Sequence, residues 1–296
     1  MRHFTKTPIL YKPGKFFKLV INRINHKIAQ NNIKTNQQLA VFSFDHIGLI
    51  INLDGRYEDL ILCLLEHFIL ENFPEAGEQV ALDIGANVGN HSVFLSQFFK
   101  TVHAFEPNPM TFDVLSVNSK YVPSKKNVVP HNIGLSDSVS NLPFITNPLN
   151  MGGSKIIHQK QGIDTSSETQ LKVKVDRGDD LQFLHGEKIT LIKIDIEGHE
   201  IQALKGLEQI IKLHKPAILF EQGMHEINSG TSEVISYLLR LGYEFYTIKK
   251  RFYLGESSLA KLLRYILISI FGDQLSFIQT KSFKKINYEL ILGISS

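Results

Sequence analysis

From residue 80 onward, short apolar runs alternate with longer segments in which apolar residues recur every three or four positions. Short runs favour buried strands, and the longer period favours amphipathic helices. The pattern predicts strands at residues 80–84, 102–106, 128–133, 191–194, 217–221 and 243–248, and helices at residues 90–99, 109–120, 200–213 and 233–241. Strands that alternate with helices indicate βαβ units, so we predict an α/β fold with a mostly parallel sheet.

The segment before this alternation has a different pattern. It predicts a hairpin of residues 41–44 and 49–53 around His46-Ile47-Gly48, followed by a helix of residues 57–70. A mild linker signal, with one proline and one glycine, lies at residues 72–79. We therefore divide the chain into a basic N-terminal arm with an accessory hairpin and helix, residues 1–75, and a second domain, residues 76–296.

Composition adds bounds on the protein class. The chain has 296 residues, of which 43% are hydrophobic and 21% charged, so it can bury a sizeable core. A net charge of +3 is too small to indicate a nucleic-acid partner. The single cysteine, Cys63, lies in an apolar run and is expected to be a buried, inert thiol in a reducing compartment. No secretory signal is visible, and the apolar run at 265–271 is too short to span a membrane, so we expect a cytoplasmic protein.

Positive charge is concentrated in two segments. The N-terminal arm contains Arg2, Lys6, Lys12, Lys15, Lys18, Arg23, Lys27 and Lys34, and residues 249–285 contain Lys249, Lys250, Arg251, Lys261, Arg264, Lys281, Lys284 and Lys285. For the arm we favour a solvated helix face over attraction to an anionic membrane or glycan. For the second segment, a lid with a solvated basic face and a guide for an anionic or membrane-borne acceptor remain equal alternatives.

Candidate chemistry follows the predicted strands, because ligands of open α/β sheets bind beyond the carboxyl ends of the strands. The first strand leads into a turn in which Gly85 and Gly89 would let the backbone approach a ligand. The second strand ends in Glu106, 23 positions after Asp83, near the offset at which a carboxylate binds ribose hydroxyls. Asn87 stands where a pyrophosphate-binding turn would have glycine. A phosphate-free adenosyl ligand with a cationic amino-acid part therefore fits better than a dinucleotide.

The strand at 191–194 leads into the densest group of charged residues. Strand alternation would direct Lys193, Asp195 and Glu197 to one side, and Gly198 permits a turn. An acid at a helix start explains Glu200. It does not explain a lysine and an aspartate on a buried central strand.

Four segments carry a specific family resemblance. They are Asp83-Ile84-Gly85-Ala86-Asn87-Val88-Gly89, Phe105-Glu106-Pro107-Asn108, Leu135-Ser136-Asp137 and Ile192-Lys193-Ile194-Asp195-Ile196-Glu197-Gly198-His199-Glu200. In order and spacing they resemble the FkbM family of methyltransferases. The resemblance implies a Rossmann-like class I methyltransferase sheet of seven strands, with S-adenosylmethionine as cofactor. The last strand, at residues 288–293, is implied only by this resemblance and would be antiparallel and inserted beside the fifth.

The resemblance also implies roles for particular residues. Glu106, followed by Pro107, corresponds to the ribose-binding acid. The methionine end of the cofactor would face the turn that contains Asp83, Gly85, Ala86, Asn87 and Gly89, and the adenine would lie near Ser136 and Asp137. Asp195 and Glu197 match the segment where acceptor meets methyl donor. His199 departs from the family pattern, which usually has a small or aromatic residue there.

A hydroxyl acceptor must lose its proton during methyl transfer. Asp195 or Glu197 is the candidate base or acceptor-orienting group, and Lys193 would stabilise the oxyanion or hold a carboxylate in place. His199 and Glu221 are further candidates, and we assign no metal site. By family analogy the acceptor is a sugar hydroxyl of a glycan or glycolipid. The alternatives are a non-catalytic adenosyl-binding protein and an RNA methyltransferase, although the N/D-P-P-Y/F/W motif of amino-methylating enzymes is missing after residue 194.

Overall fold

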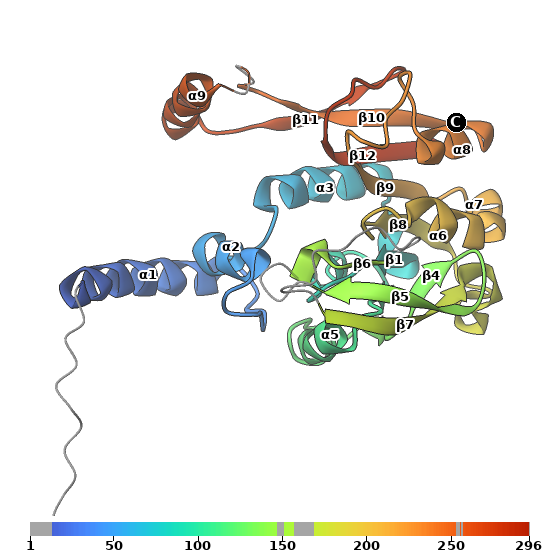
Figure 1. The fold of residues 1–296 in the computed structure, drawn as a ribbon, viewed down its shortest axis with the longest axis horizontal. Coiled ribbons are helices and arrows are strands. Elements are labelled where there is room, and N and C mark those ends of the chain that lie inside the picture. The colour runs from blue at the N-terminus through green and yellow to red at the C-terminus, as the bar shows by residue number, and fades with distance from the viewer. Residues whose placement is uncertain (1–13, 147–150, 157–168, 253–254, 256, 296) are drawn as a thin grey trace, which may run out of the picture.

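The computed structural model describes residues 14–146, 151–156, 169–252, 255 and 257–295. Within them, the main sheet contains β1 (Val80–Ile84), β2 (Thr101–Phe105), β3 (Val128–His131), β8 (Ile189–Ile194), β9 (Ala217–Gln222), β10 (Tyr243–Lys250), β11 (Leu275–Gln279) and β12 (Tyr288–Ser295). Their order across the sheet is β11-β10-β12-β9-β8-β1-β2-β3. Figure 1 shows this sheet extending through the molecule, with helices on both faces.

The direction of the strands defines a mixed sheet. The run from β9 through β8, β1 and β2 to β3 is parallel, and β12 lies antiparallel between β9 and β10. The last strand thus lies beside the fifth predicted strand, as expected. The predicted count of seven is wrong for the described residues, which contain eight, because β11 folds back antiparallel on β10 and adds an edge strand.

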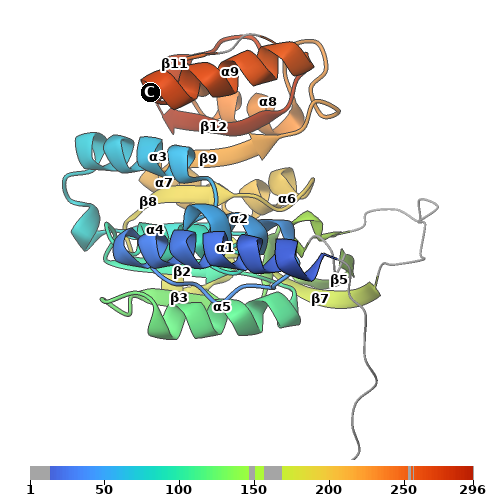
Figure 2. The same cartoon turned by 90° about the vertical axis from the view of Figure 1, so that its left-hand side faces the viewer.

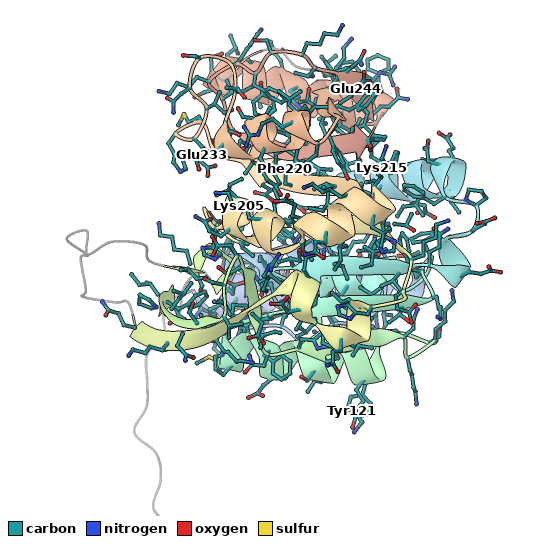
Figure 3. The ribbon with its side chains drawn as sticks, turned by 90° about the vertical axis from the view of Figure 1, so that its right-hand side faces the viewer. Tyr121, Lys205, Lys215, Phe220, Glu233 and Glu244 are labelled. Atoms are coloured by element: carbon teal, nitrogen blue, oxygen red, sulfur yellow. The ribbon has the colours of Figure 1, made fainter. Side chains whose placement is uncertain are left out.

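Alternating side chains of the strands supply two hydrophobic cores. Val80, Leu82 and Ile84 of β1 pack toward α6 (Glu200–Gly206), α7 (Glu208–His214) and α8 (Glu233–Arg240). Ala81 faces the opposite layer, which contains α3 (Asp59–Asn72), α4 (Asn90–Leu95) and α5 (Pro109–Tyr121). Period-two alternation on a sheet covered on both faces explains why most residues of the central strands are apolar, with Asp83 and Lys193 among the exceptions. Figure 3 shows Phe220 in the interior and Tyr121 at the outer surface.

Two predicted helices are shorter in the structure. The helix predicted at 200–213 is divided at Leu207 into α6 and α7, because the carboxylate of Asp179 accepts the N–H groups of Gln209 and Ile210 at the start of α7. The helix predicted at 90–99 ends at Leu95. The carboxamide of Asn127 donates to the carbonyl groups of Ser96 and Phe99 just beyond that end.

The N-terminal segment is helical, and the predicted hairpin is wrong. The helix α1 (Lys15–Thr35) precedes α2 (His46–Asp54), which replaces the hairpin. The carboxylate of Asp45 accepts the N–H of Ile47 at the start of α2, and Gly55 ends it in the left-handed conformation. Such caps favour a helix over a strand.

The helix α3 joins the N-terminal segment to the main core. Its residues Leu62, Leu65 and Ile69 are buried with residues of the main sheet, so the predicted boundary at residue 75 does not separate two cores. Cys63 is half-buried rather than buried, and Arg56 donates to its Sγ at 3.1 Å. Among the described residues, no helix is both long enough and apolar enough to cross a membrane.

A second sheet was not predicted. It contains β4 (Gly134–Ser136), β5 (Ser140–Thr146), β6 (Lys155–Ile156) and β7 (Thr169–Arg177), in the order β4-β7-β5-β6. The remaining elements are α9 (Ser258–Phe271) and the short 3-10 turns η1 (Ala76–Glu78), η2 (Met151–Gly153), η3 (Gly178–Asp180) and η4 (Gln182–Leu184). The small sheet lies beside the carboxyl ends of the main strands and contributes residues to the site described next.

Candidate active site

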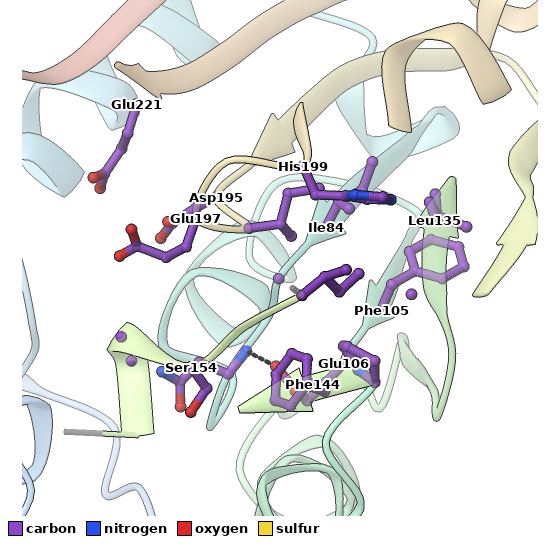
Figure 4. A pocket seen from close by; sticks show the side chains of 18 of the residues that line it. Ile84, Phe105, Glu106, Leu135, Phe144, Ser154, Asp195, Glu197, His199 and Glu221 are labelled. Carbon is purple, nitrogen blue, oxygen red and sulfur yellow. Dashed lines mark hydrogen bonds between the residues drawn. The ribbon is translucent and has the colours of Figure 1, made fainter. Parts of the chain in front are cut away.

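A cavity opens at the carboxyl edge of the main sheet (Figure 4). The strand ends contribute Ile84, Gly85, Asn87, Phe105, Glu106, Pro107, Asp195, Ile196, Glu197, His199 and Glu221. The small sheet and its loops contribute Gly134, Leu135, Phe144, Gly152, Gly153, Ser154 and Ile156, and the N-terminal segment contributes His46, Ile47 and Tyr57. This edge is where open α/β sheets bind ligands, so we treat the cavity as the candidate active site.

Close packing within the chain shapes the turn after β1. Gly85 has φ 79°, and a Cβ there would lie 1.9 Å from the carbonyl oxygen of Asp195. Gly89 has φ 94°, and a Cβ there would lie 2.8 Å from a methyl group of Leu115. Glycine is therefore required at both positions by the fold itself. Gly85 lines the cavity, whereas Gly89 packs against α5 rather than approaching a ligand.

Glu106 is buried at the end of β2 and faces the cavity. Its Oε2 accepts the N–H of Asn87 at 3.0 Å, and its Oε1 accepts the N–H of Asn108 at 2.8 Å. Burial raises the pKa of Glu106 to about 7, although the two N–H groups oppose the shift. The buried Oδ1 of Asn87 has no hydrogen-bond partner within the described residues. The turn after β1 is thus hydrogen-bonded to Glu106, and Oδ1 of Asn87 remains available to accept a hydrogen bond.

Lys193 links two aspartates beneath the cavity. Lys193 and Asp83 are register neighbours on β8 and β1, and the Nζ of Lys193 lies 3.6 Å from Oδ1 of Asp83 and 3.2 Å from Oδ2 of Asp195. Asp83 is fully buried, and its other oxygen accepts the hydroxyl of Ser92 at 2.5 Å. Burial lowers the pKa of Lys193, but Asp195 and Asp83 outweigh that effect and raise it. Lys193 is therefore the cation that balances both carboxylates.

Further carboxylates crowd the same end of the cavity. In Figure 4, Asp195, Glu197 and Glu221 gather on the side away from Leu135. Burial, followed by the charges of Asp195 and Glu58, raises the pKa of Glu221 to about 9, so this carboxyl is protonated at neutral pH. Burial and Asp195 also raise the pKa of Glu197.

The structure gives the other predicted site residues different positions. Glu197 reaches the cavity from a turn, with φ 52° after β8 has ended, so strand alternation does not direct it there. Ala86 belongs to the hydrophobic core, and Ser136 and Asp137 lie outside the cavity lining. Gly134 and Leu135 line it instead. His199 lines the cavity, but its ring is buried and its Nε2 is 3.0 Å from Oγ of Ser136, an arrangement that holds α6 to β4.

The N-terminal segment supplies site residues that the sequence did not reveal. Tyr57 exchanges two backbone hydrogen bonds with the carboxamide of Asn90 at the start of α4. The carboxamide of Asn118 likewise accepts the N–H of Ala40 and donates to its carbonyl group. It also donates to the carbonyl group of Val88 in the turn after β1. Burial, followed by neighbouring acids such as Glu58, raises the pKa of Tyr57 to about 12. These bonds join residues far apart in sequence, so no local pattern indicates them.

The described part of the chain holds no group of three or more His, Cys, Asp or Glu side chains arranged to bind a metal ion. The site is instead organised by carboxylates, one buried lysine and backbone N–H groups.

The strand order, the acid after β2 and the cavity define a Rossmann-like α/β protein with a candidate ligand site at the carboxyl edge of its sheet. The family model of the methyltransferase FkbM domain matches residues 83–245. The chain belongs to this family.

Three known proteins are similar to the chain. The hexuronic acid methyltransferase AglP of Haloferax volcanii is 35% identical over 178 residues, which are 59% of this chain and 66% of that protein. The methyltransferase sdnD of Sordaria araneosa is 29% identical over 155 residues, 43% of this chain and 60% of that protein. The chain thus spans two thirds or less of these relatives' lengths. The crystal structure of an FkbM methyltransferase from Methylobacillus flagellatus has a TM-score of 0.40 at 17% identity and covers 94% of this chain and 60% of that chain.

Proposed function

We propose that this protein is an S-adenosylmethionine-dependent methyltransferase that methylates a sugar hydroxyl. The observation that carries the proposal is the cavity itself, since one continuous lining joins Glu106 and the β1 turn to the carboxylates after β8 and to Glu221 near the end of β9. A donor and an acceptor bound at the two ends would meet beside Asp195. Family membership supports methyl transfer.

The residues at the first end suit an adenosyl ligand. Glu106 can accept ribose hydroxyls while it keeps its two backbone donors, because a carboxylate offers about four acceptor positions. The unpartnered Oδ1 of Asn87 and the backbone of Gly85 face the cationic part of such a ligand. When bound, the cofactor supplies a methyl group on a positively charged sulfur, which is already activated for transfer.

The residues at the second end suit a hydroxyl acceptor. Asp195, paired with Lys193, accepts the hydroxyl proton as the oxygen becomes nucleophilic, and Lys193 keeps that carboxylate in position. Glu197 and the protonated Glu221 orient neighbouring hydroxyls through hydrogen bonds. Alignment of the acceptor and exclusion of water provide the rest of the rate enhancement.

A sugar fits this lining better than a nucleic acid does. Carboxylates accept hydrogen bonds from several sugar hydroxyls, whereas they repel the phosphates of RNA. The similarity to a hexuronic acid methyltransferase supports a saccharide acceptor.

Two measurements test the proposal. Calorimetry should detect binding of S-adenosylmethionine and S-adenosylhomocysteine but not of NAD. Labelled methyl transfer to a panel of saccharides should then give turnover, with RNA as the comparison substrate and Asp195→Asn as the inactive control. Binding without turnover on any saccharide would support the non-catalytic alternative, and transfer to RNA would replace the sugar with a nucleic acid.

A further inference from the structure

The helix α1 has no buried side chain, although Asn32 near its C-terminal end donates to the carbonyl group of Leu53 in α2. It has 21 residues and none is buried, and Phe16 and Phe17 are 81% and 68% exposed. At 100° per residue, the apolar side chains that share one face are those of Phe16, Phe17, Val20, Ile21, Ile24 and Ile28. Most helical stability in proteins comes from packing an amphipathic face. None of the described residues buries this face, so it is available to a partner.

The charge of α1 identifies the kind of partner. The helix carries five basic residues, Lys15, Lys18, Arg23, Lys27 and Lys34, and neither aspartate nor glutamate. A second α1 packed on the first would bring like charges together, which is unfavourable. A surface of anionic lipid headgroups instead complements the cations and accepts the apolar face.

The helix α9 presents a second apolar face. Its exposed side chains on one face are those of Leu259, Leu262, Leu263, Ile266 and Ile270. Two nearby cations hold the helix in place: Arg264 pairs with Asp273, and Arg251 donates to the carbonyl group of Phe271. The basic segment at 249–285 thus positions α9 through these two residues, whereas Lys250 pairs with Glu289 and joins β10 to β12. The side chain of Lys261 lies outside the described residues.

The helices α1 and α9 lie on one side of the molecule. Figure 1 shows them at the same side, and Figure 2, viewed from that side, shows both facing the reader. β10 is parallel to β9, so the chain leaves β10 for α9 at the carboxyl edge of the sheet. The helix α2, which follows α1, contributes His46 and Ile47 to the cavity.

We propose that α1 and α9 form an anionic-membrane-binding surface. The apolar faces enter the boundary between headgroups and acyl chains, the cations of α1 contact the headgroups, and the protein lies on the membrane without crossing it. This surface is independent of the proposed methyl transfer. It would lie next to α2, which contributes His46 and Ile47 to the cavity lining.

Vesicle co-sedimentation of the full chain tests the surface. The protein should sediment with vesicles of phosphatidylcholine and phosphatidylglycerol, remain largely free with phosphatidylcholine alone, and dissociate as salt is added. The Phe16→Ser/Phe17→Ser variant should bind at least about tenfold more weakly, and each of Lys15→Gln, Lys18→Gln and Arg23→Gln about fivefold more weakly. Leu262→Ser/Leu263→Ser tests α9 in the same way.

The matched control is Leu213→Ser at the end of α7. Leu213 is 77% exposed, close to the 81% of Phe16. This variant should bind as the unchanged protein does. Equal binding to neutral vesicles, or no binding to anionic ones, would overturn the proposal. A stable dimer in light scattering that Phe16→Ser/Phe17→Ser dissociates would also overturn it, and would assign the faces to a subunit interface. The assay contains no methyl donor or acceptor, so its outcome does not depend on the proposed activity.

Discussion

Replacing Lys193 with methionine isolates the ion-pair cluster beneath the cavity. The substitution keeps an unbranched side chain of similar length but leaves Asp83 buried without a cation. The side chains of Lys193 and Asp83 are 8% and 0% exposed, so solvent offers little compensation. Removing one partner of a buried ion pair costs about 3–5 kcal/mol. The lost pair with Asp195 adds less to this cost, because the side chain of Asp195 is 32% exposed.

Urea unfolding followed by circular dichroism measures this cost as a change in the free energy of unfolding. The matched control is Lys188→Met, which removes a pair with Glu75 at 4.0 Å whose side chains are 65% and 71% exposed. It should cost less than about 1 kcal/mol. The double variant Asp83→Asn/Lys193→Met removes both buried charges and should cost less than the sum of its single substitutions. A loss below about 1 kcal/mol for Lys193→Met, or strict additivity in the double variant, would refute the ion-pair argument.

Three other predictions concern the cavity acids. Glu106→Ala should weaken binding of S-adenosylmethionine by about 1–3 kcal/mol in calorimetry, and unchanged affinity in a folded variant would remove Glu106 from the cofactor site. Asp195→Asn or Glu197→Gln should lower kcat roughly 100-fold or more, and near-normal turnover in both would assign proton removal to other groups. Folding raises the pKa of Glu221 from 4.5 to about 9, so its contribution to stability is present below pH 4.5 and is lost as the pH rises toward 9. Glu221→Gln should therefore gain stability relative to the unchanged protein across that range in thermal unfolding, and a constant difference would contradict the raised pKa.

The sequence predicted the main sheet because its strands are apolar on both faces. The parallel strands and the positions of Glu106 and Asp195 at their ends follow from that pattern and from the rule for open sheets. The sequence also contains a pattern that predicts one strand of the small sheet. Residues 171–176 alternate apolar and polar side chains, and Val173 and Val175 are buried there. This is the ordinary pattern of a strand with one covered face.

Other features depend on contacts between distant residues. The division at Leu207 requires Asp179, and the position of Tyr57 requires Asn90. No local sequence pattern indicates either contact, because each joins residues that are far apart in the chain. The helix α2 is a different case, since Asp45 and Gly55 are recognisable start and stop signals. Its run of isoleucine and leucine nevertheless favours strands, because β-branched residues are enriched in them.

The most direct test of the proposed function follows the label from methyl-labelled S-adenosylmethionine into a saccharide. The purified protein, with Asp195→Asn as its control, is incubated with neutral sugars and hexuronates. The labelled products are then treated with mild alkali, which distinguishes methyl ethers from methyl esters. Transfer to a hydroxyl gives a methyl ether that resists alkali, whereas transfer to a carboxylate gives an ester that alkali removes. We predict an alkali-stable label that depends on Asp195. An alkali-labile label, or none on any saccharide, would contradict methylation of a sugar hydroxyl.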